Sequence, residues 1–458
     1  MVGAVDKHLA LMGFMGAGKT QLGRELAGLT QRPFVDTDAE IEKRFGPIPE
    51  LFDRGEAEFR RIEEQVVAEA LAGPTAVIAL GGGAVLSEAT QERLQRRAFV
   101  AWVPVDVETA WDRVGSSDRP LARDPEAFRR LYDERLDVYD VLAEGSGSDV
   151  ESLLLAALQI VFSSRKVPYV GAVIADERVA ALHDIELLGP AVSTHLVPGG
   201  EEAKTPAVAE RLWNELTIRR DGWIVAFGGG STTDVAGFVA STHLRGVHWV
   251  AVPTTLVGMV DAAIGGKTGI NTNQGKNLVG AFHFPWQVFL DLELLRTLPD
   301  EERRAGMAEV VKTGLLAGRE LWSLPEDEMI RASAAFKTAV VLSDPYEREG
   351  RRAVLNLGHT FAHAIEAGSN YAVRHGDAVA LGLLAALRLS GRPTDVVDEL
   401  LSPRPVLADR GRAWEALRRD KKATADQLNL VLLGDHGGYV APVAEADARR
   451  ALDELIAE

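Results

Sequence analysis

The sequence predicts an α/β fold with parallel sheets, because short apolar strands alternate with helical stretches along most of the chain. After about Thr297 the strand signals fade, and helical periodicity rich in Ala, Leu and Arg takes over. At about 100–200 residues per domain, 458 residues allow roughly two to four domains. We expect an α/β domain over residues 1–162, a linker over 163–168, an α/β nucleotide-binding domain over 169–297 and an α-helical domain over 298–458. The expected strands are Leu9–Met12, Ala76–Leu80, Phe99–Val103, Ala172–Ala175, Ile224–Phe227 and Trp249–Val252.

The composition excludes several kinds of site and partner. The chain has 50 Lys and Arg against 67 Asp and Glu, a net charge of −17, and no cysteine. Without cysteine there are no disulfides, thiolate metal ligands or cysteine nucleophiles. The acidic balance argues against binding of nucleic acid, and it favours small anionic substrates held in local basic pockets.

Neither a secretory signal nor a membrane span is expected. Asp6, Lys7 and His8 interrupt the N-terminal apolar residues. A membrane helix requires ~18 uninterrupted apolar residues, and the longest runs, Leu153–Phe162 and Ala378–Leu387, reach about half of that. The sequence therefore predicts a cytoplasmic protein without a membrane partner.

A phosphate-binding loop follows the first expected strand. The pattern Gly13-x-x-x-x-Gly18-Lys19-Thr20 precedes a helix expected over Gln21–Leu29. In such a loop the backbone N–H groups hold the β-phosphate, the lysine bridges the β- and γ-phosphates, and the threonine hydroxyl ligates Mg²⁺. The expected ATP-binding residues are Gly16, Ala17, Gly18, Lys19, Thr20 and Gln21.

Three further patterns in the first half suit an acceptor site, although each has an ordinary structural meaning. Asp36 and Asp38 follow a strand two residues apart, so we expect their side chains on one face, whereas such a pair is commonly a solvated turn. The helix Glu58–Glu63 carries arginines and glutamates, a pattern that is typical of a solvent face. The glycines 81–83 end a strand, where their N–H groups could approach a ligand or form a turn.

Together these motifs resemble shikimate kinase over about residues 5–160, in the family's order. The resemblance implies that Asp38 accepts a hydrogen bond from the attacking shikimate hydroxyl and that Asp36 lies near Mg²⁺, directly or through water. Lys19, Asp38 and Arg119 are then the catalytic residues, with Arg119 on a lid that closes over the phosphates. The remaining residues carried over are Arg60 and Arg135 for the shikimate carboxylate, and Gly81, Gly82 and Gly83 for the acceptor pocket.

The second half contains a strand, a glycine turn and a helix, the arrangement of a dinucleotide site. Trp223–Phe227 is an apolar strand, and residues 228–234 (GGGSTTD) open a helical segment. Taken alone this signal is weak, because any such turn can contain glycines. Lys267 and Lys276 lie in further glycine-rich loops, where they suit anionic ligands.

Three histidines within 17 residues indicate a metal site. His359 and His363 are one helical turn apart, and His375 begins a new segment. A single histidine is commonly a satisfied core residue, but three beside a possible acidic ligand in residues 308–313 favour nitrogen and oxygen donors. Such a site, without cysteine, is catalytic rather than structural. Zinc is the first choice, and another divalent ion remains an alternative.

At this point the resemblance is to 3-dehydroquinate synthase, over about residues 169–445. It implies that Glu309, His359 and His375 are the metal ligands and that His363 is an acid/base or hydrogen-bonding residue. It makes Asp261, Lys312 and His363 the catalytic residues. The implied NAD-binding residues are Gly199, Glu201, Lys204, Gly230, Ser231, Thr232, Thr233, Asp234, Thr254, Thr255, Lys267, Lys276, Leu294 and Thr297.

The same resemblance implies an anionic substrate and a homodimer formed through the C-terminal half. Arg245 matches an arginine that the family supplies from a neighbouring subunit. NAD and the metal would oxidise a hydroxyl of 3-deoxy-D-arabino-heptulosonate 7-phosphate, phosphate would leave by β-elimination, and hydride return with aldol closure would give 3-dehydroquinate. The other implied substrate-binding residues are Lys267, Asn277, Lys337, Arg352, Asn356 and one of Lys421 and Lys422.

The leading hypothesis is a bifunctional enzyme, a shikimate kinase fused ahead of a 3-dehydroquinate synthase. One alternative is a small-molecule kinase of another acceptor fused to a metal-dependent polyol dehydrogenase or another sugar-phosphate cyclase. A regulatory, nucleotide-binding pseudoenzyme is the other. The paired arginines 60 and 135 argue against a neutral acceptor, and the intact Lys19, Glu309 and His359 argue against a pseudoenzyme.

Overall fold

The computed structural model describes residues 3–115, 124–163, 167, 171–188, 191–421 and 427–457. The chain divides into two compact units. The first is Met1–Val161 with Thr338–Ser343, and the second is Phe162–Lys337 with Asp344–Glu458. Among the residues that the structure describes, none of the helices has the length and apolar character needed to span a bilayer.

The first unit is built on a five-stranded sheet in the order β2-β3-β1-β4-β5. The central strand β1 (His8–Met12) is buried along its whole length and pairs in parallel with β3 (Val77–Ala79) and β4 (Ala98–Trp102). The edges are β2 (Phe34–Asp36) and β5 (Gly145–Ser146). The three strands expected in this half are confirmed, since continuous apolar runs suit a parallel sheet that helices cover on both faces.

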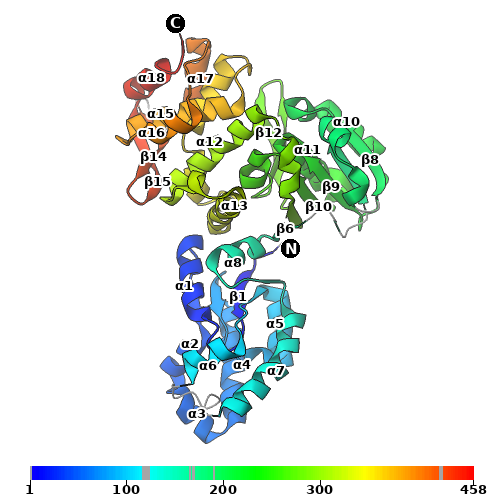
Figure 1. Cartoon of the computed structure of the whole chain (residues 1–458), viewed down its shortest axis with the longest axis vertical. Helices are drawn as coiled ribbons and strands as arrows, with labels where there is room; N and C mark the ends of the chain where they lie inside the picture. Colours follow the sequence, from blue (N-terminus) through cyan, green and yellow to red (C-terminus); the bar gives the residue numbers. More distant parts are fainter. Residues whose placement is uncertain are drawn as a thin grey trace. The chain divides into compact units, whose positions relative to one another are not determined.

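Helices connect and surround these strands, as Figure 1 shows. Several begin at a side chain that caps their first N–H groups; Ser87, for example, accepts a hydrogen bond from Thr90 N at the start of α5. The helices of the first unit are α1 (Lys19–Thr30), α2 (Thr37–Phe45), α3 (Ile48–Arg54), α4 (Glu56–Ala72), the 3₁₀ turn η1 (Ala84–Leu86), α5 (Glu88–Arg97), α6 (Val107–Val114), α7 (Pro125–Leu142) and α8 (Val150–Ala157).

The second unit contains a six-stranded sheet in the order β6-β13-β10-β9-β7-β8. The strand β9 (Trp223–Gly228) pairs in parallel with β7 (Gly171–Asp176) and β10 (His248–Pro253). The other strands are β6 (Ile160–Phe162), β8 (Ala191–Val197) and β13 (Gln287–Leu290). The three strands expected here are confirmed, and each extends one residue beyond both expected ends.

Two antiparallel hairpins add to this unit, and the sequence interpretation missed both. The first joins β11 (Lys267–Thr272) to β12 (Gly275–Phe282), and the second joins β14 (Gln427–Gly434) to β15 (Gly437–Ala444). The second hairpin corrects the expectation that strands end near Thr297. More than half of β12 and half of β15 are exposed, and neither sequence alternates apolar with polar residues, which is the pattern that predicts a half-buried strand.

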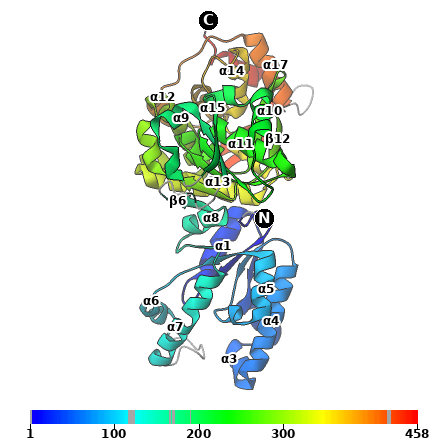
Figure 2. The same cartoon turned by 90° about the vertical axis from the view of Figure 1, so that its right-hand side faces the viewer.

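Helices and short turns complete the second unit. Figure 1 shows α12 between the sheet strands β9 and β10 and the helices α15–α18, and Figure 2 shows the same unit after a quarter turn. They are α9 (Glu177–Leu182), η3 (Ile185–Leu188), η4 (Gly200–Ala203), α10 (Pro206–Glu215), α11 (Gly230–Thr242), η5 (His243–Arg245), η6 (Gly258–Ala262), η7 (Leu292–Thr297), α12 (Asp300–Ala317), η8 (Leu321–Ser323), α13 (Glu326–Ser343), η9 (Arg351–Asn356), α14 (His359–Gly368), α15 (His375–Leu389), α16 (Asp395–Leu401), α17 (Arg410–Lys421) and α18 (Glu445–Asp453).

The core of the helical part forms where α14 crosses α15. Gly358 precedes α14 with φ +78°, and a Cβ atom at Gly382 would lie 2.1 Å from the carbonyl oxygen of Gly358. Only two glycines allow the helices to approach this closely. The contact fixes the start of α14, and with it the position of His359.

Candidate active sites

The phosphate loop of the first unit has the conformation that its glycines predict. Gly16 and Gly18 adopt φ values of +83° and +88°, and Gly18 is the N-cap of α1. A Cβ atom at Gly13 would lie 2.5 Å from the carbonyl oxygen of Val103. Lys19 Nζ donates hydrogen bonds to the carbonyl oxygens of Gly13 and Phe14, at 2.8 and 3.1 Å. The loop therefore holds its own lysine at the helix N-terminus, where the backbone favours an anion.

Asp36 joins this loop, whereas Asp38 is placed differently from the expectation. Thr20 Oγ1 donates to Asp36 Oδ2 at 2.6 Å, so the two predicted Mg²⁺ ligands are adjacent. Strand β2 ends at Asp36, whose side chain caps α2 by accepting from Ala39 N. Asp38 consequently lies in the first turn of α2. The argument that both carboxylates share one face of a strand is wrong, because the cap ends the strand between them.

The side chain of Asp38 lies beside Gly81, the first of the three glycines that follow β3. A Cβ atom at Gly81 would lie 2.5 Å from Asp38 Oδ1 and 2.6 Å from Glu63 Oε1, so only glycine leaves room for both carboxylates. Arg60 forms an ion pair with Glu63 at 2.7 Å, and its guanidinium fills the space beside Gly83. Burial raises the pKa of the Glu63 carboxyl, although the charge of Arg60 opposes the shift.

Arg135 approaches the same strand end from α7. Its NH1 donates to the carbonyl oxygen of Gly82 at 2.9 Å, and Tyr139 donates to the same oxygen at 2.8 Å. Arg135 is only 2% exposed, and its Nε is buried with no hydrogen-bond partner in the described part of the chain. Burial raises the pKa of Tyr139 to about 12. A buried guanidinium with a free donor suits a carboxylate ligand.

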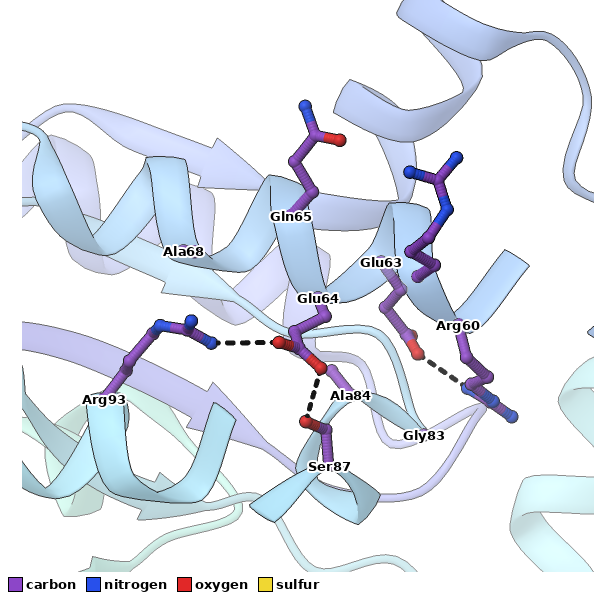
Figure 3. A pocket seen from close by; sticks show the side chains of 10 residues that line it. Arg60, Glu63, Glu64, Gln65, Ala68, Gly83, Ala84, Ser87 and Arg93 are labelled. Carbon is purple, nitrogen blue, oxygen red and sulfur yellow. Dashed lines mark hydrogen bonds and ion pairs between the residues drawn. The ribbon is translucent and has the colours of Figure 1, made fainter. Parts of the chain in front are cut away.

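A cavity of about 470 Å³ borders Arg60 and Gly83 on the side of α4. Figure 3 shows Arg60 paired with Glu63 there, and Glu64 bound to both Arg93 and Ser87. The first pair lies beside Gly83, a predicted acceptor residue, whereas the contacts of Glu64 join α4 to the start of α5. The lining residues are Arg60, Arg61, Glu63, Glu64, Gln65, Ala68, Gly83, Ala84, Ser87 and Arg93.

The second unit brings together the three predicted metal ligands. Glu309, His359 and His375 each offer one ligand atom, and these atoms lie within 4.8 Å of one another. Glu309 is 1% exposed, and its carboxylate lies 3.4 Å from His359 Nε2 and 3.5 Å from His375 Nε2. The ring of His363 stands edge-on to His359 at 5.7 Å. Two nitrogens and a buried carboxylate suit a divalent metal with open positions.

A chain of buried charges extends from this cluster. Lys312 is 2% exposed and forms ion pairs with Glu309 and Asp261, and Lys337 donates to Asp261. Burial opposes the charge of Glu309, but Lys312 and His359 outweigh it and hold the pKa of Glu309 well below its usual range. Burial lowers the pKa of Lys337. Paired ions this deeply buried carry desolvation costs that a structural role alone seldom explains.

The glycine turn after β9 opens α11 at Gly230, as expected. The hydroxyl oxygens of Thr232 and Thr254 are buried and have no hydrogen-bond partner among the described residues. A Cβ atom at Gly230 would lie 2.8 Å from the Cβ atom of Ala262. The turn therefore places these two hydroxyls near the N-terminus of α11, which favours an anionic ligand.

Lys204 lies at the centre of a hydrogen-bond network among the predicted NAD-binding residues. Its ammonium pairs with Asp234 at 2.6 Å and donates to the side chain of Asn277. Asn271 donates to Glu201 at 2.7 Å, from the hairpin that also carries Asn277. Burial raises the pKa of Asp234, which Lys204 opposes. The network joins η4, α11 and β12 at the carboxyl edge of β9.

The predicted anion-binding residues Lys267 and Arg352 share a carboxylate. Glu347 forms ion pairs with both, and its contact with Arg352 is 3.8 Å long. Arg352 is 3% exposed and donates to the carbonyl oxygens of Gly265 and Pro345 at 3.1 and 2.8 Å. Its Nε is buried with no hydrogen-bond partner in the described ranges. These donors suit an anionic substrate group.

The other predicted residues lie at the margins of these clusters or outside the description. Arg245 is exposed at the end of η5, with φ +68°. Thr297 forms a hydrogen bond of 2.7 Å with His183, and Leu294 is buried in η7. Gly199 packs against the Arg178 guanidinium, which occupies the space of a Cβ atom.

Arg119 and Lys422 lie outside the described residues, as does the side chain of Lys421. Of the rest, Ala17 is buried in the loop, Gln21 is exposed on α1, Ser231 and Thr233 lie in the first turn of α11, Thr255 follows β10 and Asn356 ends η9.

Four further residues at these sites were missed. Glu63 and Tyr139 contact the predicted acceptor residues Arg60 and Gly82, and Glu347 and Glu366 contact predicted ligand residues. Glu63 and Glu366 are each 3% exposed, so burial distinguishes them from solvent glutamates. Their sequence signal is helical spacing: Glu63 follows Arg60 by three residues, and Glu366 follows His363 by three.

The chain is similar to two enzyme families along its length. Residues 15–149 match the family model of shikimate kinase, residues 194–305 that of the 3-dehydroquinate synthase N-terminal part, and residues 306–402 that of its C-terminal part. The chain is 41% identical over 301 residues to 3-dehydroquinate synthase of Corynebacterium pseudotuberculosis (strain C231), which covers 60% of this chain and 82% of that protein. It is 46% identical over 286 residues to 3-dehydroquinate synthase of Thermobifida fusca (strain YX), covering 55% and 76%.

A solved structure is similar to the second half. It is a 2-deoxy-scyllo-inosose synthase complexed with carbaglucose-6-phosphate, NAD⁺ and Co²⁺, with a TM-score of 0.56 and 26% identity. The similarity covers 63% of this chain and 91% of that chain.

Proposed function

Because the chain belongs to the 3-dehydroquinate synthase family and carries a shikimate kinase domain ahead of the synthase, we propose that one chain performs two reactions of the shikimate pathway. The kinase transfers phosphate from ATP to shikimate and forms shikimate 3-phosphate. The synthase converts 3-deoxy-D-arabino-heptulosonate 7-phosphate to 3-dehydroquinate and phosphate. The observation that carries the proposal is the occurrence of both family matches in order along one chain. The two reactions are not consecutive, so the fusion implies no transfer of an intermediate between the sites.

In the kinase, we assign phosphate binding to the loop of residues 13–20 and acceptor binding to the glycines 81–83 that follow β3. Lys19 would bridge the phosphates of ATP, and Thr20 with Asp36 would hold Mg²⁺. Asp38 would orient the attacking hydroxyl. Arg60 and Arg135 would bind the shikimate carboxylate, a role that the free Nε of Arg135 supports. Arg119 remains the predicted lid arginine.

In the synthase, the residues Glu309, His359 and His375 fit a divalent metal. The buried Glu309 carboxylate lies 3.4 and 3.5 Å from the Nε2 atoms of His359 and His375 and pairs with Lys312, so oxygen and nitrogen donors converge at one buried point. The metal would polarise the hydroxyl that is oxidised. The donor set favours zinc, and the Co²⁺ of the inosose synthase supports a divalent ion at such a fold.

NAD would bind at the carboxyl edge of β9, and the presence of NAD⁺ in the inosose synthase structure supports NAD as the nucleotide. The Gly230 turn would hold the pyrophosphate, and the network of Glu201, Lys204 and Asp234 would bind the remainder of the nucleotide. The free hydroxyls of Thr232 and Thr254 support this assignment. The other predicted NAD-binding residues stay as proposed from the resemblance.

The synthase substrate carries a carboxylate and a phosphate, and we assign its anionic groups to the basic residues around the cluster. Arg352 and Lys267 would bind one anion. Lys337, which donates to Asp261, would also donate a hydrogen bond to the substrate. Lys312 would stabilise negative charge that develops on the substrate beside Glu309. Lys337 is a candidate for proton transfer, because burial lowers its pKa from the ordinary value of a lysine, although Asp261 opposes the shift.

Similarity favours dehydroquinate over the products of other sugar-phosphate cyclases. Identity is 41–46% to the two dehydroquinate synthases and 26% to the inosose synthase. We further propose a homodimer formed through the C-terminal half, to which Arg245 contributes, and a cytoplasmic location, where ATP and NAD are both supplied. The domain division at 1–162, 169–297 and 298–458 stays a prediction.

The test measures both reactions on one purified protein. With Mg-ATP, the protein should phosphorylate shikimate. With catalytic NAD, it should release phosphate from 3-deoxy-D-arabino-heptulosonate 7-phosphate without net formation of NADH. Removal of metal by a chelator should abolish phosphate release, and added Zn²⁺ should restore it. Absence of both activities with all cofactors supplied would contradict the proposal.

A further inference from the structure

One carboxylate oxygen links two predicted sites of the synthase. Glu366 Oε1 lies 3.3 Å from His375 Nδ1 and 3.2 Å from Lys276 Nζ. His375 is a predicted metal ligand on α15, and Lys276 is a predicted NAD-binding residue on β12. The same oxygen therefore accepts from a group of each site.

The surroundings fix this link in place. The Glu366 side chain is 4% exposed, at the end of α14, so water cannot easily substitute for either partner. The ring of Tyr371 lies 4.8 Å from Lys276 Nζ and covers the ammonium. Asn370 and Tyr371 adopt φ values of +54° and +62°, a costly conformation that brings the ring to this position. Lys276 remains 25% exposed and can still reach an anionic ligand.

We propose that Glu366 is a positioning residue that couples the metal centre of the synthase to its nucleotide site, through the oxygen shared by His375 and Lys276. The inference rests on the proposed function, because it assumes that both ligands bind. Glu366 contacts neither ligand itself. It acts through the orientation and electron density of the His375 ring, and Lys276 modulates that effect.

The direction of the coupling follows from competition for the oxygen. In the structure the Lys276 ammonium draws electron density from Glu366 Oε1. A bound nucleotide supplies Lys276 with a second anion, so Glu366 becomes a stronger acceptor for His375 Nδ1–H. The opposite nitrogen, His375 Nε2, then becomes a better metal ligand. Metal and NAD should each raise the affinity of the protein for the other by the same factor.

The experiment measures binding in the full chain without turnover. Zn²⁺ affinity is determined by competition with a chromophoric chelator, with and without saturating NAD⁺, and NAD⁺ affinity by calorimetry, with and without Zn²⁺. The variants are Glu366→Gln, Lys276→Met and the conservative Lys276→Arg. Glu293→Gln, which removes an exposed carboxylate paired with Arg296, is the matched control. Shikimate phosphorylation and circular dichroism verify that each variant is folded.

We expect NAD⁺ to raise Zn²⁺ affinity about fivefold or more in the unchanged protein and in the control. Glu366→Gln should lower Zn²⁺ affinity by about 10- to 100-fold and abolish the coupling. Lys276→Met should leave coupling below about twofold, and Lys276→Arg should retain most of it. Coupling that persists in Glu366→Gln and Lys276→Met, or that is absent from an unchanged protein that binds both ligands, would overturn the inference alone. Failure of the unchanged protein to bind either ligand would overturn the proposed function with it.

Discussion

Lys337 Nζ donates hydrogen bonds to both the carboxylate and the backbone carbonyl of Asp261, each 2.6 Å long. The contact joins α13 to η6, the short turn that lies between β10 and the β11–β12 hairpin. It orients a carboxylate that also forms an ion pair with Lys312 at 3.8 Å. Lys337 therefore fixes the position of Asp261 beside Lys312 and Glu309.

Lys337→Met should damage the synthase through this pair. It leaves the half-buried Asp261 with the longer contact to Lys312, so the free energy of unfolding of the second unit should fall by about 3 kcal/mol. We expect kcat/KM for phosphate release to fall at least about 100-fold and shikimate phosphorylation to stay unchanged. Chemical denaturation and the two assays measure these effects. Full synthase activity in the variant would contradict the role of Lys337.

Glu63→Gln should weaken shikimate binding by the kinase. The carboxylate holds Arg60 NH1 at 2.7 Å, and its loss frees the guanidinium from the acceptor pocket. The KM for shikimate should rise about tenfold, the size of one charged hydrogen bond, while the KM for ATP stays constant. Glu64→Gln is the matched control, because Glu64 binds Arg93 and Ser87 instead. An equal effect of both substitutions would point to a loss of helix stability.

Asp344 should give the synthase a pH-dependent stability. Its carboxylate accepts from the backbone N–H groups of Arg348, Glu349 and Arg351 at 2.8–3.2 Å and holds the turn before Arg352. Burial opposes its charge, but these N–H groups outweigh it and lower the pKa below the ordinary 3.8. The stabilisation is therefore complete above pH 3.8 and is lost as the pH falls through the folded-state value.

Asp344→Ala measures this contribution. The variant should lose about 2 kcal/mol of unfolding free energy at neutral pH, and the difference from the unchanged protein should shrink below pH 3.8. Denaturation at a series of pH values provides the readout. Glu349→Gln, an exposed change on the same turn, is the control. A difference that stays constant down to pH 2 would show that the carboxylate charge is unimportant.

Gly382→Ala should disable the synthase selectively. The added Cβ atom would lie 2.1 Å from the carbonyl oxygen of Gly358, so α14 and α15 must separate and His359 must move. We expect a loss of more than about 3 kcal/mol in the second unit, weaker Zn²⁺ binding and intact shikimate phosphorylation. Gly391→Ala, where a Cβ atom meets nothing within 4 Å but the φ of +63° is strained, controls for backbone effects alone. Equal losses in the two variants would contradict the packing argument.

Sequence reasoning predicted the elements whose signal is local. The strands of both sheets are apolar runs, and the phosphate loop has a fixed spacing between its glycines and Lys19. A metal site was also predicted, because three histidines lie within 17 residues, and the resemblance to 3-dehydroquinate synthase named Glu309, His359 and His375 as its ligands. For the strands and the phosphate loop, the chemistry of a short segment decides the structure.

Features that depend on distant contacts were missed or misplaced. Asp36 and Asp38 do not share a strand face, because Asp36 turns to cap α2 and bind Thr20. Glu366 resembles any helical glutamate until β12 brings Lys276 to it. The hairpin β14–β15 had a local signal, the alternation of Gln427–Leu430, but exposed residues on β15 conceal its partner. Tertiary pairing, which no short segment contains, supplies these features.

The most direct test of the bifunctional assignment is to assay both reactions on Lys19→Ala and Glu309→Ala. Lys19→Ala removes the ammonium at the phosphate loop, and Glu309→Ala removes the buried carboxylate of the metal cluster. We predict that the first variant loses shikimate phosphorylation and keeps 3-dehydroquinate formation, and that the second does the reverse. Loss of both activities in either variant, or retention of both, would contradict two independent sites in one chain.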